Sequence, residues 1–204
     1  MCKFDDLDEK AKDRARDAAR YANVDYEWWD TVYEDVVNMA SLLGITISTT
    51  LRTTSKGREY RDIDIWFRGF SSQGDGATFS GKYEYVADAV ARVTAETGGN
   101  DPGLLRIAQE LTLMQLTQRM SGKAPFEGGI DGRHRNHIDA TIYMWGEDEV
   151  GEPDEEQFTD LMQEFADWIF SRLEDEYDYL TSDEAIRESI ISNEAEFDWE
   201  GNHA

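Results

Sequence analysis

A row of acidic residues in the last quarter of the chain has the spacing needed to imitate a nucleic-acid backbone. Residues three or four positions apart on a helix have Cβ atoms about 5–6 Å apart, which resembles the separation of successive phosphates on one DNA strand. A rigid row of such carboxylates would fit the groove of a nucleic-acid-binding protein. The alternative is an ordinary solvated helix face. The residues concerned are Asp160, Glu164, Asp167, Glu174, Asp175, Glu176 and Asp178.

The charge of the protein is concentrated in the same region. Residues 147–204 hold 21 acids against two arginines, a net −19 out of −24 for the whole sequence. Such a chain is repelled by nucleic acid and by anionic lipid, so we expect neither a direct nucleic-acid contact nor a membrane contact. Basic proteins are the expected partners. An acidic protein from a halophile is the alternative, but that origin predicts acids scattered over the whole chain.

A glycine-rich loop is the second candidate site. Gly-Asp-Gly between two strands is suitable turn chemistry, because glycine tolerates positive φ and aspartate caps its own backbone. The other interpretation is a loop whose amides and Asp75 hold an anion or a metal, although no phosphate-cradling GxxxxGK[ST] pattern is present. A structural hairpin loop is favoured. Its motif residues are Phe70, Ser72, Gln73, Gly74, Asp75 and Gly76.

Two further groups of residues are candidate metal sites. Asp62, Asp64 and Asp75 together would suit a metal-dependent enzyme, but spacing alone does not bring them together. A metal site needs three or four converging ligands, and the second group offers two histidines close in sequence. We therefore expect no metal and no cofactor, and no catalytic motif such as H-E-x-x-H is found. The second group is Asp131, His134, His137 and Asp139.

The single cysteine and the hydropathy of the sequence indicate the cellular compartment in which we expect the protein. The single Cys2 has no intrachain partner for a disulfide, which favours a reducing compartment. No run approaches the roughly 18 apolar residues of a membrane helix, and acids occupy the place of a signal-peptide apolar stretch. We expect a protein of the cytoplasm.

Helical periodicity places amphipathic elements around these candidates. A first helix at 5–22 begins with a capping box at Asp6 and Glu9, and its apolar stripe is mostly alanine, which would suit a homodimer interface. Gly44 ends the second helix, and Thr181 with Glu184 forms a capping box that starts the last one. The remaining predicted helices cover 26–43, 86–97, 101–120 and 158–180.

Period-two alternation predicts strands at 45–52, 62–68 and 78–85, which we expect to pair as an antiparallel meander. A fourth strand, 137–145, carries apolar bulk on both faces and should be central; residues 121–136 are a basic, glycine-rich loop. The fold class is α+β, a small antiparallel sheet of about four strands with helices on one side. Residues 1–146 form the core and 147–204 an acidic helical segment packed on it.

Two stretches carry a resemblance to a known family. FRGFSSQGDGATF and the C-terminal WIFSRLEDEYDYLTSDEAIRESIISNEAEF resemble small acidic proteins of bacteriophages and prophages, which pair F-x-G-F-x-S-Q-G-D-G with E-Y-x-Y-x-T-S-D-E. The resemblance covers roughly the last three-quarters of the chain. It implies a phage or mobile-element origin. Some members of that family are labelled antitoxins, and the resemblance supplies no catalytic residues.

Three functions follow as hypotheses. The first is a phage-encoded, non-catalytic inhibitor that acts as a nucleic-acid mimic on a host defence protein, a CRISPR effector or restriction enzyme, in the host cytoplasm. The second is an antitoxin-like protein with Trp28, Trp66 or Trp199 as anchors of a protein–protein interface. The third is the metal-dependent enzyme built on Asp62, Asp64 and Asp75.

Overall fold

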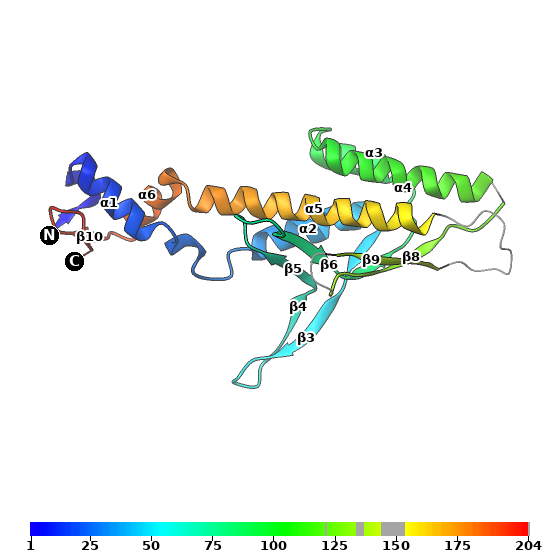
Figure 1. The fold of residues 1–204 in the computed structure, drawn as a ribbon, viewed down its shortest axis with the longest axis horizontal. Helices are drawn as coiled ribbons and strands as arrows, with labels where there is room; N and C mark the ends of the chain where they lie inside the picture. The colour runs from blue at the N-terminus through cyan, green and yellow to red at the C-terminus, as the bar shows by residue number, and fades with distance from the viewer. Residues whose placement is uncertain (121, 134–136, 144–153, 204) are drawn as a thin grey trace. The chain divides into compact units, whose positions relative to one another are not determined.

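The α+β class predicted from the sequence is confirmed by a computed structural model of the chain (Figure 1). The structure describes residues 1–120, 122–133, 137–143 and 154–203. Two compact units are formed: Met1–Val32 with Arg172–Ala204 is unit 1, and Tyr33–Ser171 is unit 2. The acidic segment 147–204 is therefore divided between the two units.

Unit 1 joins residues from both ends of the sequence. Strand β1 pairs antiparallel with β10, so that Cys2 lies opposite Phe197. One apolar core is shared by both halves of the unit, and the alanine face of α1 packs into it through Ala11 and Ala15. These two alanines are buried within the unit and are therefore not available for the predicted homodimer contact. The elements are β1 Cys2–Lys3, η1 Phe4–Asp6, α1 Glu9–Ala19, η2 Ala22–Val24, α6 Asp183–Ser192 and β10 Glu196–Phe197.

Both capping boxes predicted in this unit were wrong by one or two residues. Helix α1 is capped by Asp8, whose Oδ1 accepts a hydrogen bond from the Ala11 amide at 2.8 Å. The preceding residues form the separate 3-10 turn η1, so the first helix is shorter than 5–22. Helix α6 is capped by Ser182, whose Oγ accepts from the Ala185 amide at 3.2 Å. Thr181 instead donates its hydroxyl to the carbonyl of Tyr177.

The main sheet of unit 2 has four antiparallel strands in the order β2-β7-β8-β9. Its side chains alternate between a buried face, which includes Ile47, Ile130 and Ala140, and an open face with Thr46 and Lys82. The strands are β2 Ile45–Ile47, β7 Gly81–Tyr83, β8 Glu127–Asp131 and β9 Asp139–Tyr143.

Each of the three strands predicted between residues 45 and 85 is broken at one residue, where it changes its pairing partner. The Ser48 amide donates to the Ser80 carbonyl at 2.8 Å, the Ser80 amide to Asp64 at 3.0 Å, and the Asp64 amide to Ser48 at 2.9 Å. Three antiparallel strand pairs extend from this closed ring of backbone hydrogen bonds. The predicted meander, in which the three strands pair along their whole length, was therefore wrong. Besides β2·β7, these two-stranded ladders are β3 Thr49–Thr53 with β4 Glu59–Ile63, and β5 Ile65–Arg68 with β6 Gly76–Phe79.

The three ladders have different surroundings. The β3–β4 hairpin extends away from the sheet (Figure 1), and its residues from Thr49 to Asp62 are exposed or half-buried. In contrast, β6 is buried apart from its first residue. The β5–β6 ladder is therefore the one that belongs to the core of unit 2.

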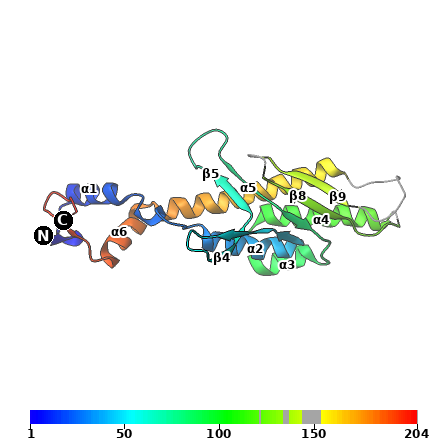
Figure 2. The same ribbon diagram turned by 90° about the horizontal axis from the view of Figure 1, so that it is seen from below.

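Helices α4 and α5 lie on one side of β8 and β9 (Figures 1 and 2). Aromatic contacts join α5 to the strands: Phe158 meets Tyr83 with ring centroids 5.5 Å apart, and Phe165 meets Phe79 at 5.3 Å. The prediction that Gly44 ends the second helix is confirmed, although that helix begins at Asp30 and not near residue 26. The helices are α2 Asp30–Leu43, α3 Ala89–Thr97, α4 Pro102–Met120 and α5 Glu155–Leu180.

Two predictions about the second half of the sheet were wrong. Strand β8 lies within 121–136, which the sequence indicates as a loop because glycines interrupt its alternation. Strand β9 is an edge strand and not a central one, since β8 alone pairs with it among the described strands. Residues 144 and 145, which supply apolar bulk to the predicted strand, lie outside the described residues.

A buried glutamine links α4 to the segment that leads into β8. Gln115 is 1 % exposed. Its Nε2 donates to the Phe126 carbonyl at 3.0 Å and to the Tyr83 hydroxyl at 3.3 Å, while its Oε1 accepts from the Phe126 amide at 3.2 Å. Burial raises the pKa of Tyr83 to about 12, with the Gln115 hydrogen bond opposing that rise. One side chain therefore satisfies both backbone groups of a buried residue.

We expect Gln115→Leu to lower the free energy of unfolding by about 2–4 kcal/mol, because the buried amide and carbonyl of Phe126 lose their partner. Urea denaturation monitored by circular dichroism measures this change. Gln109→Leu on the exposed side of the same helix is the matched control and should stay within about 0.5 kcal/mol of the wild type. Equal effects of the two substitutions would contradict the role given to Gln115.

Candidate functional site

Three of the predicted carboxylates lie on the part of α5 that belongs to unit 2. Asp160 and Asp167 are exposed, and Glu164 is half-buried. Glu164 forms an ion pair with Arg106 of α4, and Asp167 accepts a hydrogen bond from Gln163 at 3.1 Å. Asp160 has no ion-pair or hydrogen-bond partner for its carboxylate among the described residues, whereas the carboxylates of Glu164 and Asp167 are each engaged by a neighbouring side chain.

The other four carboxylates lie near the end of α5, in unit 1. Glu174, Asp175 and Asp178 are exposed, and Asp175 pairs with Arg172 at 3.0 Å. Each helical residue turns the side-chain direction by about 100°, so these three share one face. Glu176 is about 160° away from Asp178 on the same count and is half-buried. Glu176 therefore does not belong to the row of carboxylates that was predicted from the sequence.

Other C-terminal acids of unit 1 are paired with basic residues near the N-terminus. Arg20 forms an ion pair with Asp183, and its hydrogen bond to that carboxylate holds the pKa of Asp183 below its ordinary value. Glu196 is paired with Lys3 at 3.5 Å, and Arg14 is paired with Glu200 at 3.8 Å. The charge excess of the last quarter is thus partly neutralised within the unit, away from the end of α5.

The glycine-rich loop between β5 and β6 is closed by Asp75. Its carboxylate accepts from the amides of Ser71 and Ser72, both at 2.7 Å, and from the Ser72 hydroxyl at 2.9 Å. The same carboxylate lies so close to Gly69 (φ +60°) that a Cβ there would come within 2.7 Å of it. Phe70 anchors the loop by stacking on Phe170, with ring centroids 5.4 Å apart.

These contacts account for most of the loop motif without a ligand. Ser72 and Asp75 build the turn, Gly74 (φ +95°) permits it, and Phe70 holds it against the core. Gln73 is exposed. Gly76 is the first residue of β6. The geometry favours the structural interpretation of the motif.

Asp62, Asp64 and Asp75 are each engaged separately. Asp62 pairs with Arg52 at 3.2 Å, Asp64 accepts from the Thr50 hydroxyl at 2.7 Å, and Asp75 is occupied by its own loop. In the described ranges, no group of three or more histidine, cysteine, aspartate or glutamate side chains is arranged to hold a metal ion. These separate contacts do not bring the three carboxylates together.

The histidine-containing group is only partly described. Asp131 forms a two-pronged ion pair with Arg133, and His137 lies 3.3 Å from Asp139. His134 lies outside the described residues. The paired register of β8 and β9 sets Asp131 opposite Asp139.

The three tryptophans considered as interface anchors differ in accessibility. Trp28 is 8 % exposed and packs against Trp29 and Tyr177 at 5.9 Å each, so it serves the core of unit 1. Trp199 is 72 % exposed. Trp66 is half-buried and lines a cavity.

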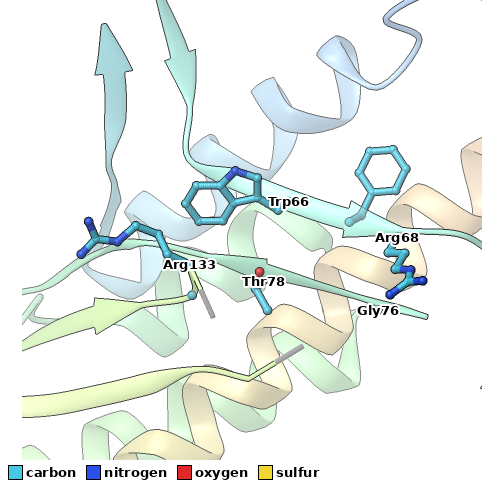
Figure 3. A pocket seen from close by; sticks show the side chains of 7 residues that line it. Trp66, Arg68, Gly76, Thr78 and Arg133 are labelled. Atoms are coloured by element: carbon cyan, nitrogen blue, oxygen red, sulfur yellow. The ribbon is translucent and has the colours of Figure 1, made fainter. Parts of the chain in front are cut away.

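That cavity, of about 550 Å³, lies over the β5–β6 ladder of unit 2 (Figure 3). The ladder register sets Trp66 opposite Thr78 and Arg68 opposite Gly76, so all four are on one face. Arg133 enters from the end of β8. The lining residues are Trp66, Phe67, Arg68, Gly76, Thr78, Gly132 and Arg133.

Gly132 brings Arg133 to this cavity. A Cβ at Gly132 would come within 2.4 Å of the Phe79 carbonyl oxygen, so the two backbones touch. The Gly132 amide also donates to the Ser80 hydroxyl at 3.1 Å. Arg133, Thr78 and Gly132 were not predicted as cavity residues. Arg133 follows strand β8, and this strand was not predicted because its glycines have no side chains from which alternation can be recognised. Alternation along 62–68 does place Trp66 and Arg68 on one face.

The chain belongs to the family described as a domain of unknown function (DUF8835), which matches residues 28–183. No curated protein and no solved structure shows a significant match. In the described part of the chain, no helix combines the length and the apolar character required to cross a membrane.

We predict that Asp75 titrates below the ordinary pKa of 3.8, chiefly because the Ser72 amide, and then the Ser71 amide, stabilise its carboxylate form. The order that this carboxylate gives the loop should persist above pH 3.8 and be lost as the pH falls through the lowered pKa. NMR titration of the Ser71 and Ser72 amide signals measures the midpoint. Asp75→Asn should remove the transition, whereas a midpoint at or above 3.8 would contradict the assigned role.

Proposed function

We propose that this member of the DUF8835 family is a non-catalytic binding protein that presents the carboxylates of α5 to a basic groove of a nucleic-acid-binding protein. The observation that carries the proposal is the acidic C-terminal end of the helix. Glu174, Asp175 and Asp178 are exposed on one face there. The last turn of α5 contains no basic residue.

This arrangement acts against the stability of the free helix. A helix C-terminus carries a partial negative charge, and an acidic residue near it costs about 0.3–1 kcal/mol. Glu174 and Asp178 are four residues apart, and a like-charge pair at that spacing costs about 0.2–0.5 kcal/mol more. Among the described residues, neither forms an ion pair. A cationic partner would convert this cost into binding free energy.

The spacing supports a nucleic-acid-binding protein as that partner. Carboxylates one helical turn apart have Cβ atoms about 5–6 Å from each other, similar to the separation of phosphates along one strand. Asp160, Glu164 and Asp167 repeat this spacing on the part of α5 in unit 2. The exposed group near the end of α5, placed in a basic groove, would compete with a phosphate backbone. In the unit 2 group, Glu164 is half-buried and paired with Arg106.

The sequence resemblance to phage and prophage proteins supports a host defence protein as the target. A CRISPR effector or a restriction enzyme has a basic nucleic-acid groove, and a phage gains from blocking it in the host cytoplasm. Inhibition would require occupancy of the groove and no chemical step.

Direct neutralisation of a toxin is the second candidate. Its supporting observation is Trp199, a large aromatic side chain that is 72 % exposed. Exposed tryptophans are frequent anchors of protein interfaces. Such an apolar contact would depend little on salt, unlike a contact through carboxylates.

A pull-down from bacterial host lysate followed by a salt titration tests the proposal. We expect binding that weakens steeply with salt and is lost in the triple variant E174K/D175K/D178K. The matched control E34K/D35K/E96K makes the same charge change at three exposed acids of unit 2 and should retain binding. Binding that survives the first variant and is lost in Trp199→Ala would support the antitoxin-like function instead.

The stability cost can be tested on the protein alone. E174Q/D178N should raise the free energy of unfolding by about 0.5–1.5 kcal/mol, because it removes one negative charge from the last turn of α5 and abolishes the like-charge pair. Thermal or urea unfolding at low ionic strength measures the gain, which should shrink at high salt. A loss of stability would show that the two carboxylates serve the fold, and would remove the physical argument for a partner.

A further inference from the structure

The cavity over the β5–β6 ladder differs in charge from the rest of the molecule. Its seven lining residues include two arginines and no acid, in a chain with 44 acids and 20 lysines and arginines. Its volume of about 550 Å³ is in the range of small-molecule sites. Figure 3 shows Trp66 and Thr78 between Arg68 and Arg133. None of these residues belongs to α5, so the cavity shares no residue with the proposed carboxylate interface.

Polar groups at this cavity have unused hydrogen-bonding capacity. Thr78 is 5 % exposed, and within the described residues its hydroxyl has no hydrogen-bond partner. The hydroxyl oxygen is not among the fully buried, unsatisfied side-chain atoms of the described residues, so it keeps contact with the solvent-filled cavity and can bond a ligand there. The indole N–H of Trp66 likewise donates to no described group. A bound molecule with acceptor oxygens would satisfy both.

The two arginines have different roles. Arg133 is held by its fork on Asp131, with Nε–Oδ1 at 3.0 Å and Nη2–Oδ2 at 2.7 Å, so its charge is largely compensated. Arg68 forms no ion pair with any described residue; its charge only helps to lower the pKa of Asp75. The space beside it is open, because a Cβ built on Gly76 would meet nothing within 4 Å. Arg68 is the group available to an anion.

Trp66 adds an aromatic surface to this cationic cavity. Its indole makes no ring contact with the described residues, whereas most other aromatic side chains of unit 2 are packed against one another. Flat rings stack on such a surface, and every nucleobase offers a π-face to it. An aromatic surface beside a guanidinium fits a ligand that joins a flat ring to an anionic group.

We propose that this cavity binds a small aromatic anion of the nucleoside monophosphate class. The base stacks on the indole of Trp66, and the phosphate accepts hydrogen bonds from the Arg68 guanidinium and the Thr78 hydroxyl. Arg133, fixed by Asp131, closes the far end of the cavity with its remaining N–H groups. This binding is independent of the proposed partner of α5, and the protein alone suffices to measure it.

Isothermal titration calorimetry with AMP and CMP tests the proposal, with adenosine and inorganic phosphate as the two half-ligands. We expect saturable binding of a monophosphate, and affinities at least about tenfold weaker for each half-ligand. Arg68→Gln should weaken monophosphate binding about tenfold, and Thr78→Val about threefold. The matched control Arg92→Gln removes an exposed arginine of α3 and should leave the affinity unchanged.

A second measurement keeps the test meaningful if the buried Thr78→Val variant folds poorly. The indole N–H signal of Trp66, assigned by its loss in Trp66→Phe, should shift in the NMR spectrum as AMP is added. Arg68 is exposed, so Arg68→Gln is expected to keep the fold. The proposal is overturned by the absence of saturable binding at millimolar nucleotide, by equal affinities of wild type and Arg68→Gln, or by inorganic phosphate binding as tightly as AMP.

Discussion

The closed ring of backbone hydrogen bonds among Ser48, Asp64 and Ser80 is the constraint on which unit 2 depends. At each of these residues a strand leaves one partner and joins another, so three ladders share one origin. One ladder extends into the four-stranded sheet and another carries Trp66, Arg68 and Thr78 over the core. The Ser80 hydroxyl also accepts a hydrogen bond from the Gly132 amide, which links the end of β8 to the same ring. A change of backbone direction at this ring would move the sheet and the cavity together.

Side-chain periodicity predicted the helices far better than the pairing of the strands. The apolar spacing from Phe158 to Leu173 marks a buried helix face, and the structure buries it. The breaks at Ser48, Asp64 and Ser80 left no such trace, because a strand that changes partner keeps the alternation of its side chains. Strand β8 was not predicted because its side chains show no clear alternation. Its glycines, one of which lies against the Phe158 ring, remove the side chains on which alternation is read.

The candidate sites were predictable to the extent that local geometry determines them. Exposure of Glu174, Asp175 and Asp178 follows from helix periodicity, and the error at Glu176 came from counting charges without their angular positions. The turn chemistry of the Asp75 loop was visible in its glycines. The cavity was not predictable, because it requires Arg133 to meet a ladder some sixty residues earlier in the chain through the contact of Gly132 with Phe79. Long-range contacts of this kind have no local signature.

The pairing of β1 with β10 affects the order in which the protein can fold on the ribosome. Residues 2–15 find their core only against residues 186–197, which are synthesised after all of unit 2. Helix α1 is therefore synthesised before unit 2, whereas the residues that cover its alanine face are synthesised after unit 2. Domains generally fold as they are made, so unit 2 can fold before unit 1. The high sequence separation of the β1–β10 contacts makes their closure a slow step.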